Sequence, residues 1–258
     1  IYCHREGLKE PHQRTLMTPD EISKIVDLAI PFGVKHVKIT GGEPLVRPDI
    51  LQIMEKIGKK KEIKDLRIVT NGLLLEKYAK GLKKANVKRI NVSLDSIDPE
   101  TYFFLSGEGN VQPVLRGISI VSHLAFALMK INMLVLKGIN NDSITDMINY
   151  ISSLMEGAST PVHLQLIELV RTNSVSNEFF TKYFYDLREN IRPWLRKKAI
   201  RKYYRKKNMR ECFVLPNNLV IELVTPTHNT LFCKYCSRLR VTADGYLKPC
   251  LMREDNLI

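Results

Sequence analysis

Three cysteines near the C-terminal end of the sequence have the spacing of metal ligands. Cys233, Cys236 and Cys250 lie in "FCKYCSRLRVTADGYLKPCL", with two residues between the first pair and thirteen before the third. Thiolates at this spacing suit either a zinc ion or an iron–sulfur cluster. A zinc site needs a fourth ligand, for which His228 is the nearest candidate, whereas a cluster held by three thiolates leaves one iron open. The cysteines alone leave both alternatives open.

The elements that must position these residues alternate between two kinds along the chain. Apolar, β-branched runs predict strands at 36–40, 66–70, 89–94, 130–136 and 163–169, and amphipathic segments predict helices near 19–31, 48–59, 75–85, 111–124 and 142–155. This alternation predicts an α/β fold with a parallel sheet and crossover helices. Because no G-x-G-x-x-G follows the first strand, we favour a partial TIM-type β/α barrel over a Rossmann sheet.

The expected strands end in polar or glycine-bearing segments, among them "TGGEP" (40–44), "TNG" (70–72) and "SLDS" (93–96). In parallel α/β folds ligands bind at the carboxyl ends of the strands, so these segments should meet at one site. After about residue 170 the pattern changes to a Lys/Arg-rich helical region and then a short strand in "LVIELVTP". We therefore expect a barrel region at 1–172 and a C-terminal region at 173–258.

Composition indicates a globular protein with an anionic partner. The 258 residues are 44% hydrophobic, enough for a buried core, and carry a net charge of +13. The segment 192–210 combines many basic residues with aromatic ones, which indicates either a polyanion-binding helix or a solvated one. Five cysteines with three clustered favour metal binding in a reducing compartment over disulfides.

The cellular compartment of the protein and the extent of the given sequence can be predicted from hydropathy and from the two ends of the chain. No apolar run of eighteen residues exists and no secretion signal precedes the fold, so we expect a cytoplasmic protein without a membrane partner. The sequence begins with Ile1 and stops after "REDNLI". We expect further residues on both sides.

Several segments together resemble a known superfamily. "YCHREG", "KITGGEPLVRPDI", "VTNGLLL" and "INVSLDSIDPETY" are similar to the radical S-adenosylmethionine (SAM) superfamily. Within it, "KINMLVLKGIN" and the three-cysteine segment resemble the MoaA family of GTP 3′,8-cyclases, which act in molybdenum-cofactor biosynthesis. The resemblance covers nearly the whole chain and is weakest across 171–215.

The resemblance implies two 4Fe-4S clusters and SAM as cofactors. Cys3 matches the last cysteine of the family's C-x3-C-x2-C pattern, whose first two positions would precede Ile1, and Cys233, Cys236 and Cys250 would hold the second cluster. Tyr2, Gly42, Ser93 and Val170 match family positions that contact SAM. Gln165 stands where bacterial members carry Arg, so that contact is not carried over.

The resemblance also implies a substrate site for GTP. Lys38 and Lys130 match positions that contact the phosphates, although family members often carry Arg where Lys38 stands, and Thr70 falls near another substrate contact. Arg238 and Arg240 match guanine-facing residues with a catalytic role. Alternate residues of an extended segment point the same way, and guanidinium groups donate to guanine O6 and N7. Neutralising the charge of the cluster is the simpler reading of both arginines.

The implied reaction converts GTP to (8S)-3′,8-cyclo-7,8-dihydroguanosine 5′-triphosphate. Reductive cleavage of SAM gives a 5′-deoxyadenosyl radical, which removes the ribose 3′ hydrogen before C3′ joins C8 of guanine. The implied partners are GTP, a reducing electron donor and a downstream cyclic pyranopterin monophosphate synthase that receives the product, and a homodimer is compatible with the family. Two alternatives are a radical SAM enzyme that modifies a peptide or RNA, and a basic zinc-ribbon protein that binds nucleic acid.

Overall fold

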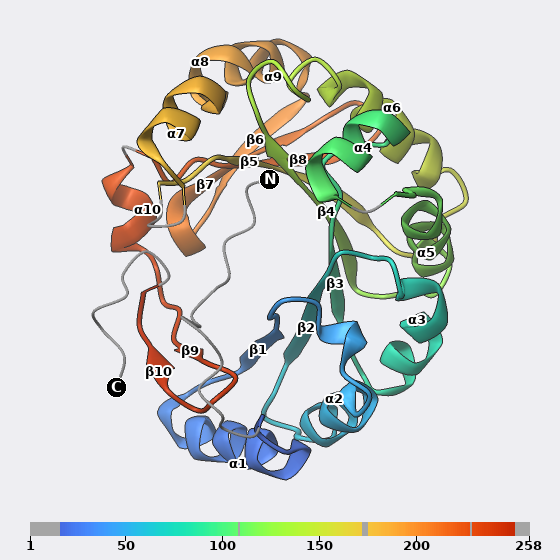
Figure 1. Cartoon of the computed structure of the whole chain (residues 1–258), viewed down its shortest axis with the longest axis vertical. Coiled ribbons are helices and arrows are strands. Elements are labelled where there is room, and N and C mark those ends of the chain that lie inside the picture. The colour runs from blue at the N-terminus through green and yellow to red at the C-terminus, as the bar shows by residue number, and fades with distance from the viewer. Residues whose placement is uncertain (1–15, 108, 172–174, 228, 251–258) are drawn as a thin grey trace.

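Eight strands of the protein form one curved sheet. The computed structural model describes residues 16–107, 109–171, 175–227 and 229–250. The strand order is β1-β2-β3-β4-β5-β8-β7-β6, and Figure 1 looks onto the arc that these strands make. Their bounds are β1 His36–Ile39, β2 Asp65–Thr70, β3 Arg89–Ser93, β4 Leu128–Val135, β5 Val162–Glu168, β6 Arg201–Arg205, β7 Arg210–Val214 and β8 Val220–Val224.

Helices cover the outer, convex side of this arc (Figure 1). The helices of the first part of the chain are α1 Pro19–Ala29, α2 Ile50–Gly58, α3 Leu75–Lys84, α4 Pro99–Ser106, α5 Gln112–Ser122 and α6 Ile144–Met155. Those that follow β5 are α7 Asn177–Tyr183, α8 Leu187–Asn190, α9 Arg192–Lys198 and α10 Thr230–Lys234. Short 3-10 helices are η1 Ile30–Phe32, η2 Pro44–Val46 and η3 Lys207–Met209.

The parallel part of the sheet confirms the expected α/β half-barrel. Neighbouring strands from β1 to β5 pair in parallel, and β8 also pairs in parallel with β5. The five strands and five helices predicted from the periodicity all form, with ends that differ by a few residues. A curved, mostly parallel sheet with helices on its outer side is the form of a partial TIM-type barrel.

The alternation of side chains along the strands separates a core from a polar face. Ile68, Ile90, Ile131, Leu164 and Ile221 come from five strands and are all fully buried toward the helices. The residues between them point to the concave side, where water and ligands have access. The hydrophobic burial on the convex side thus leaves the concave side free for polar chemistry.

The segment after β5 differs from the sequence prediction. The interpretation of 192–210 as one basic helix is wrong, because α9 ends at Lys198 and an antiparallel hairpin of β6 and β7 follows. β7 then pairs antiparallel with β8. The many basic residues obscured the alternation of apolar and polar positions that predicts a strand. Long cationic side chains are tolerated on an exposed edge strand such as β6. The hairpin extends the sheet and adds residues to its concave face.

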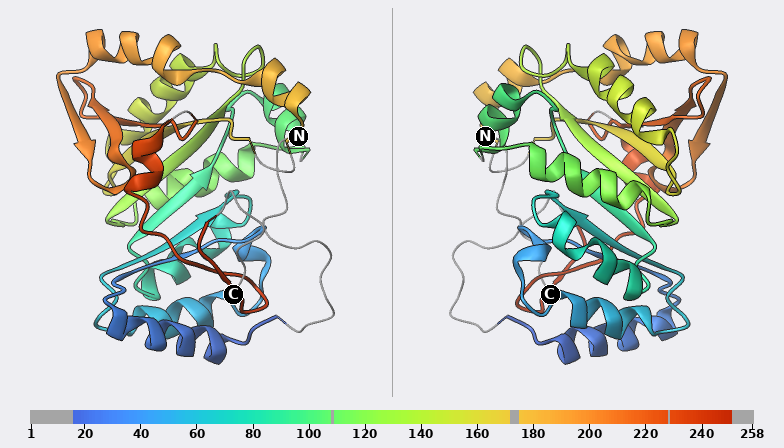
Figure 2. Two further views of the ribbon diagram at one scale, coloured as in Figure 1. Left: turned by 90° about the vertical axis from the view of Figure 1, so that its left-hand side faces the viewer. Right: turned by 90° about the vertical axis from the view of Figure 1, so that its right-hand side faces the viewer.

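The cysteine segment lies across the open side of the arc. After α10 the chain forms a small hairpin of β9 Arg240–Val241 and β10 Leu247–Lys248. Figures 1 and 2 show this hairpin running from α10 toward α1 at the other end of the sheet, where the amide of Met17 donates to the carbonyl of Ala243 (3.4 Å). The turn predicted at "TADG" is confirmed, with Gly245 in the left-handed region and its amide donating to the Thr242 carbonyl (3.0 Å).

The described helices include none that is long and apolar enough to cross a membrane.

Glu43 of "TGGEP" joins the ends of the first two strands. Its carboxylate accepts hydrogen bonds from the Leu45 amide (2.9 Å), the Thr70 hydroxyl (2.7 Å) and the Asn71 amide (2.6 Å). The Thr70 hydroxyl in turn accepts from the Gly72 amide (3.0 Å). A single carboxylate therefore shapes the loops at the carboxyl ends of β1 and β2.

We predict that Glu43→Gln lowers the free energy of unfolding by about 1–3 kcal/mol, because an amide group cannot accept all three bonds and one donor loses its partner. Urea denaturation of the full-length protein measures this. Glu55→Gln, an exposed glutamate on α2, is the control and should change stability by less than about 0.5 kcal/mol. Equal stability of the two variants would contradict the role of Glu43.

Candidate functional site

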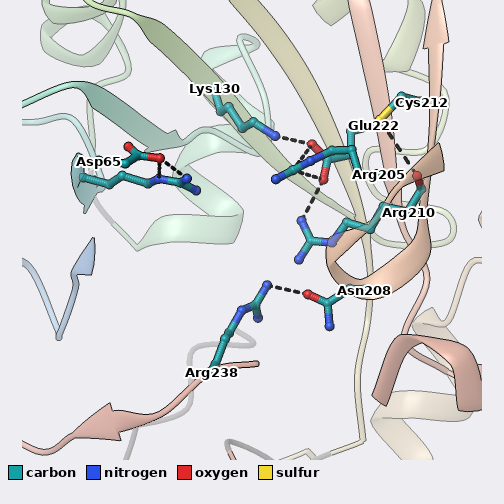
Figure 3. A network of polar contacts seen from close by, with 9 residues as sticks. Asp65, Lys130, Arg205, Asn208, Arg210, Cys212, Glu222 and Arg238 are labelled. Atoms are coloured by element: carbon teal, nitrogen blue, oxygen red, sulfur yellow. Dashed lines mark hydrogen bonds and ion pairs between the residues drawn. The ribbon is translucent and has the colours of Figure 1, made fainter. Parts of the chain in front are cut away.

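A buried carboxylate on β8 gathers three cations on the concave face. Glu222 is 1% exposed, and Figure 3 shows Lys130, Arg205 and Arg210 pointing at it from β4, β6 and β7. Arg205 Nη1 lies 2.7 and 2.9 Å from its two oxygens, Arg210 Nη1 lies 2.9 Å from one of them, and Lys130 Nζ donates to the other. Burial alone would raise the pKa of Glu222, but the three cations lower it to about 2.

Lys130 is therefore one member of a buried ion cluster. Burial lowers the pKa of the Lys130 ammonium, whereas Glu222 acts in the opposite direction and favours the charged form. Because three cations share one carboxylate, the cluster keeps excess positive charge. The phosphate contact implied for Lys130 would be made from this cluster.

Lys38 on β1 faces the same space from the other end of the sheet. Lys38 is exposed on the open side of the arc, but partial desolvation by the surrounding chain, followed by the charges of four arginines, lowers its pKa to about 8. In order of effect these are Arg238, Arg210, Arg67 and Arg240. The tertiary structure therefore brings together Lys38 and the "SRLR" arginines, which the sequence separates by two hundred residues. Like charges at close range repel, so an anion bound among them would be stabilised.

The two arginines of the cysteine segment, Arg238 and Arg240, differ in their surroundings. Burial and then Arg210 lower the pKa of Arg238 to about 10, and its Nη2 donates to the Asn208 side-chain oxygen (3.1 Å). Arg240 begins β9 and pairs in register with Lys248. Arg238 is thus the more enclosed of the two and keeps further N–H donors for a ligand.

Of the residues expected to contact SAM, the three that the structure describes, Gly42, Ser93 and Val170, lie at the carboxyl ends of strands. A Cβ added at Gly42 would meet no atom within 4 Å, and Ser93 is exposed at the end of β3. Ser93 of β3 pairs in register with Asn132 of β4, Asn132 with Gln165 of β5, and Gln165 with Glu222 of β8. These four residues form one polar row across the concave face. Val170 follows β5 and is half-buried. These positions leave space for a ligand above the strand ends.

Thr70 has a different environment from the other predicted contacts. It is 2% exposed, and its hydroxyl is engaged by Glu43 and by the Gly72 amide. Its evident role is to hold the loop after β2 in place.

Two carboxyl groups near these strand ends titrate close to neutrality. Burial raises the pKa of Asp95 to about 7, although its Oδ1 accepts from the Leu134 amide (2.7 Å). Burial likewise raises the pKa of Glu168 to about 7, and its Oε1 accepts from the Leu187 amide (3.2 Å).

The three C-terminal cysteines are free thiols. Cys233 and Cys236 are exposed around the end of α10, and Cys250 is half-buried after β10. Burial raises the pKa of the Cys236 thiol, but the Arg238 amide, the Asn208 side chain and the nearby arginines together lower it below its ordinary value. Within the described parts of the chain, no three His, Cys, Asp or Glu side chains are gathered closely enough to hold a metal ion. Three free thiols in cationic surroundings nevertheless fit an iron–sulfur cluster as a donor set.

Tyr2, Cys3 and His228 lie outside the described residues, so their predicted roles remain predictions. Sequence reasoning missed Glu222, Arg205, Arg210 and Asn208. A charged residue inside the apolar run "LVIELV" was the available signal for Glu222, because a buried carboxylate requires cations beside it.

Comparisons with known proteins agree with this geometry. The radical SAM superfamily model matches residues 1–151, and the model described as Molybdenum Cofactor Synthesis C matches residues 162–258. A protein of Pyrococcus horikoshii named a probable GTP 3′,8-cyclase is 40% identical over 262 residues, covering 100% of this chain and 81% of that protein. The chain belongs to the radical SAM superfamily and, within it, to the GTP 3′,8-cyclase family.

Further relatives carry the same name. The protein of Methanococcus maripaludis is 40% identical over 260 residues, and that of Thermococcus kodakarensis is 41% identical over 263 residues. Each match covers 100% of this chain and 82% of the relative. Membership of the radical SAM superfamily implies a 4Fe-4S cluster and SAM. It also sets aside the alternative of a zinc-ribbon protein without enzymatic activity.

We predict that Glu222→Gln lowers the free energy of unfolding at pH 7 by about 3 kcal/mol, because the buried Lys130 and Arg210 and the partly exposed Arg205 lose their shared counter-charge. The pKa of Glu222 is about 2 in the folded protein and about 4.3 when unfolded, so its contribution is present above pH 4.3 and is lost as the pH falls toward 2.

The difference in stability between wild type and Glu222→Gln should therefore shrink over this pH window. Denaturant titrations at several pH values measure it, with the exposed Glu62→Gln as control. A difference that does not depend on pH would show that Glu222 is not ionised in the folded protein.

Proposed function

We propose that this chain is a radical SAM GTP 3′,8-cyclase that converts GTP to (8S)-3′,8-cyclo-7,8-dihydroguanosine 5′-triphosphate. The observation that carries the proposal is the excess of cationic over anionic side chains on the concave face. A triphosphate neutralises several such cations at once, and its oxygens accept from ammonium and guanidinium donors. Family membership gives this anion site its chemical context.

Different residues of the site bind the triphosphate and the guanine of GTP. Lys38 and Lys130 bind the triphosphate, Lys38 as an ammonium among arginines and Lys130 from the Glu222 cluster. Arg238 and Arg240 bind the guanine from the cysteine segment that lies across the open side of the arc. Thr70 acts close to the substrate by shaping the loop after β2.

The cofactors have separate places in this proposal. Tyr2, Gly42, Ser93 and Val170 contact SAM, and Cys3 is a ligand of the first cluster. Cys233, Cys236 and Cys250 hold a second 4Fe-4S cluster next to the guanine. Cluster and SAM together supply an organic radical when an electron arrives. The protein's own residues hold the ribose beside that radical and exclude water, as a reactive radical requires.

The proposal includes partners beyond GTP. A reducing electron donor delivers the electrons, and the product passes to a cyclic pyranopterin monophosphate synthase, a reaction sequence that we place in the cytoplasm. The regions 1–172 and 173–258 supply the SAM site and the guanine site respectively, and a homodimer is compatible with this division. A peptide or RNA substrate is the alternative that an assay with GTP must exclude.

We expect the full-length protein, reconstituted anaerobically with iron and sulfide, to produce 5′-deoxyadenosine and the cyclised nucleotide from SAM and GTP. Arg238→Ala and Arg240→Ala should abolish cyclisation while slow SAM cleavage persists, because the radical forms without a correctly held base. Chromatography of both products measures this. Arg196→Ala, an exposed position on α9, is the matched control. A preparation that cleaves SAM but consumes no GTP would disprove the substrate.

We also expect the affinity for GTP to fall as the pH rises through about 8, because Lys38 loses its proton there and with it the attraction for phosphate. The phosphates themselves are already ionised at this pH. Lys38→Arg keeps the charge at this position, whereas Lys130, whose pKa burial also lowers to about 8, still loses its proton, so the variant should show a smaller decline in affinity than wild type. Calorimetric titrations across this range test the prediction, and an identical decline in both proteins would assign the titration to another group.

A further inference from the structure

Asn208 occupies a buried turn between the half-barrel and the cysteine loop. It lies in η3 between β6 and β7 and is fully buried. Its backbone is left-handed, with φ of 60°, a conformation that Asn tolerates better than most residues. A polar side chain at such a position is stable only when its hydrogen bonds are made within the protein.

Three polar groups of Asn208 contact the cysteine segment. Its backbone amide donates to the Tyr235 carbonyl (3.2 Å), and its Nδ2 donates to the Phe232 carbonyl (2.7 Å). Its Oδ1 accepts from Arg238 Nη2 (3.1 Å), the contact drawn in Figure 3. One amide thus holds the helix end before the loop and the arginine after it.

Arg210, the first residue of β7, links the Asn208 turn to the Glu222 ion cluster. Arg210 bonds Glu222 (2.9 Å) and lies over the Phe232 ring, 5.5 Å from its centre. Asn208 and Arg210 both contact Phe232, which precedes Cys233. The bond between Arg210 and Glu222 therefore anchors the turn to the sheet, and Asn208 of this turn contacts Arg238. The position of Arg238 thus depends on the concave face of the sheet.

We propose that Asn208 is a positioning residue that orients the Arg238 guanidinium toward the base of a purine nucleotide. Accepting one N–H directs the remaining donors of the planar guanidinium, and guanine O6 and N7 are acceptors that such donors reach. Asn208 determines base selectivity in this way, while phosphate binding belongs to the lysines and arginines around Lys38. The inference rests on the proposed function and adds a residue that acts through Arg238.

Asn208→Gly gives a selective test, because glycine keeps the left-handed backbone and the amide bond to Tyr235 but removes the side chain. Asn218→Gly is the matched control, since Asn218 is also left-handed (φ 66°) but exposed in the turn between β7 and β8. Each variant is made in the full-length, cluster-loaded protein. Iron and sulfide content are measured first, followed by anaerobic calorimetric titration with GTP and with inorganic tripolyphosphate, which lacks a base.

We expect Asn208→Gly to retain its iron and its affinity for tripolyphosphate but to bind GTP about tenfold more weakly, as for one lost charged hydrogen bond. Asn218→Gly should match wild type. Asn208→Asp keeps an acceptor for Arg238 and should retain GTP affinity within about threefold. Adding Arg238→Ala to Asn208→Gly should cause no loss beyond that of Arg238→Ala alone, because the two act as one unit.

Two results would overturn the inference. One is unchanged preference for GTP over tripolyphosphate in Asn208→Gly. The other is loss of iron or of tripolyphosphate affinity in both Asn208 variants, which would show a general structural role. A wild-type protein that does not prefer GTP to tripolyphosphate would instead contradict the proposed function, so the two failures are distinguishable.

Discussion

The Glu222 carboxylate is the interaction on which the polar side of this protein depends. Lys130, Arg205 and Arg210 come from three different strands, and without a shared anion their charges would repel one another inside the sheet. Because Glu222 carries one charge against three, it permits the cations to assemble without neutralising them. The concave face is consequently stable and still attracts anions.

The division of the sheet into two faces explains how such a site coexists with a stable fold. Apolar residues of each parallel strand pack against the outer helices, and the alternate positions are left for polar groups. The row from Ser93 through Asn132 and Gln165 to Glu222 follows from register alone. Sequence-distant residues thereby line a single surface, with the residues proposed to contact SAM at its edge and the cations across it.

The cysteine segment is connected to this surface by the hairpin of β6 and β7. Its turn places Asn208 against Phe232 and Arg238, and β7 places Arg210 between Glu222 and the same phenylalanine. The β9 and β10 hairpin then reaches Met17 near α1. The open side of the half-barrel is thus bordered by a loop whose geometry is determined by the barrel itself.

Periodicity and local chemistry in the sequence by themselves determined the five parallel strands, their crossover helices and the turn before Cys250. The family motifs indicated the candidate cluster ligands Cys233, Cys236 and Cys250 and the candidate ligand contacts Gly42, Lys38 and Lys130. The tertiary structure alone decided that Lys38 lies among Arg67, Arg210, Arg238 and Arg240, and that Lys130 shares Glu222 with two arginines. It also revealed the β6 and β7 hairpin and Asn208. The physical reason is that hydrophobic periodicity encodes which face of an element is buried, whereas long-range ion pairs and strand neighbours leave no local trace in the sequence.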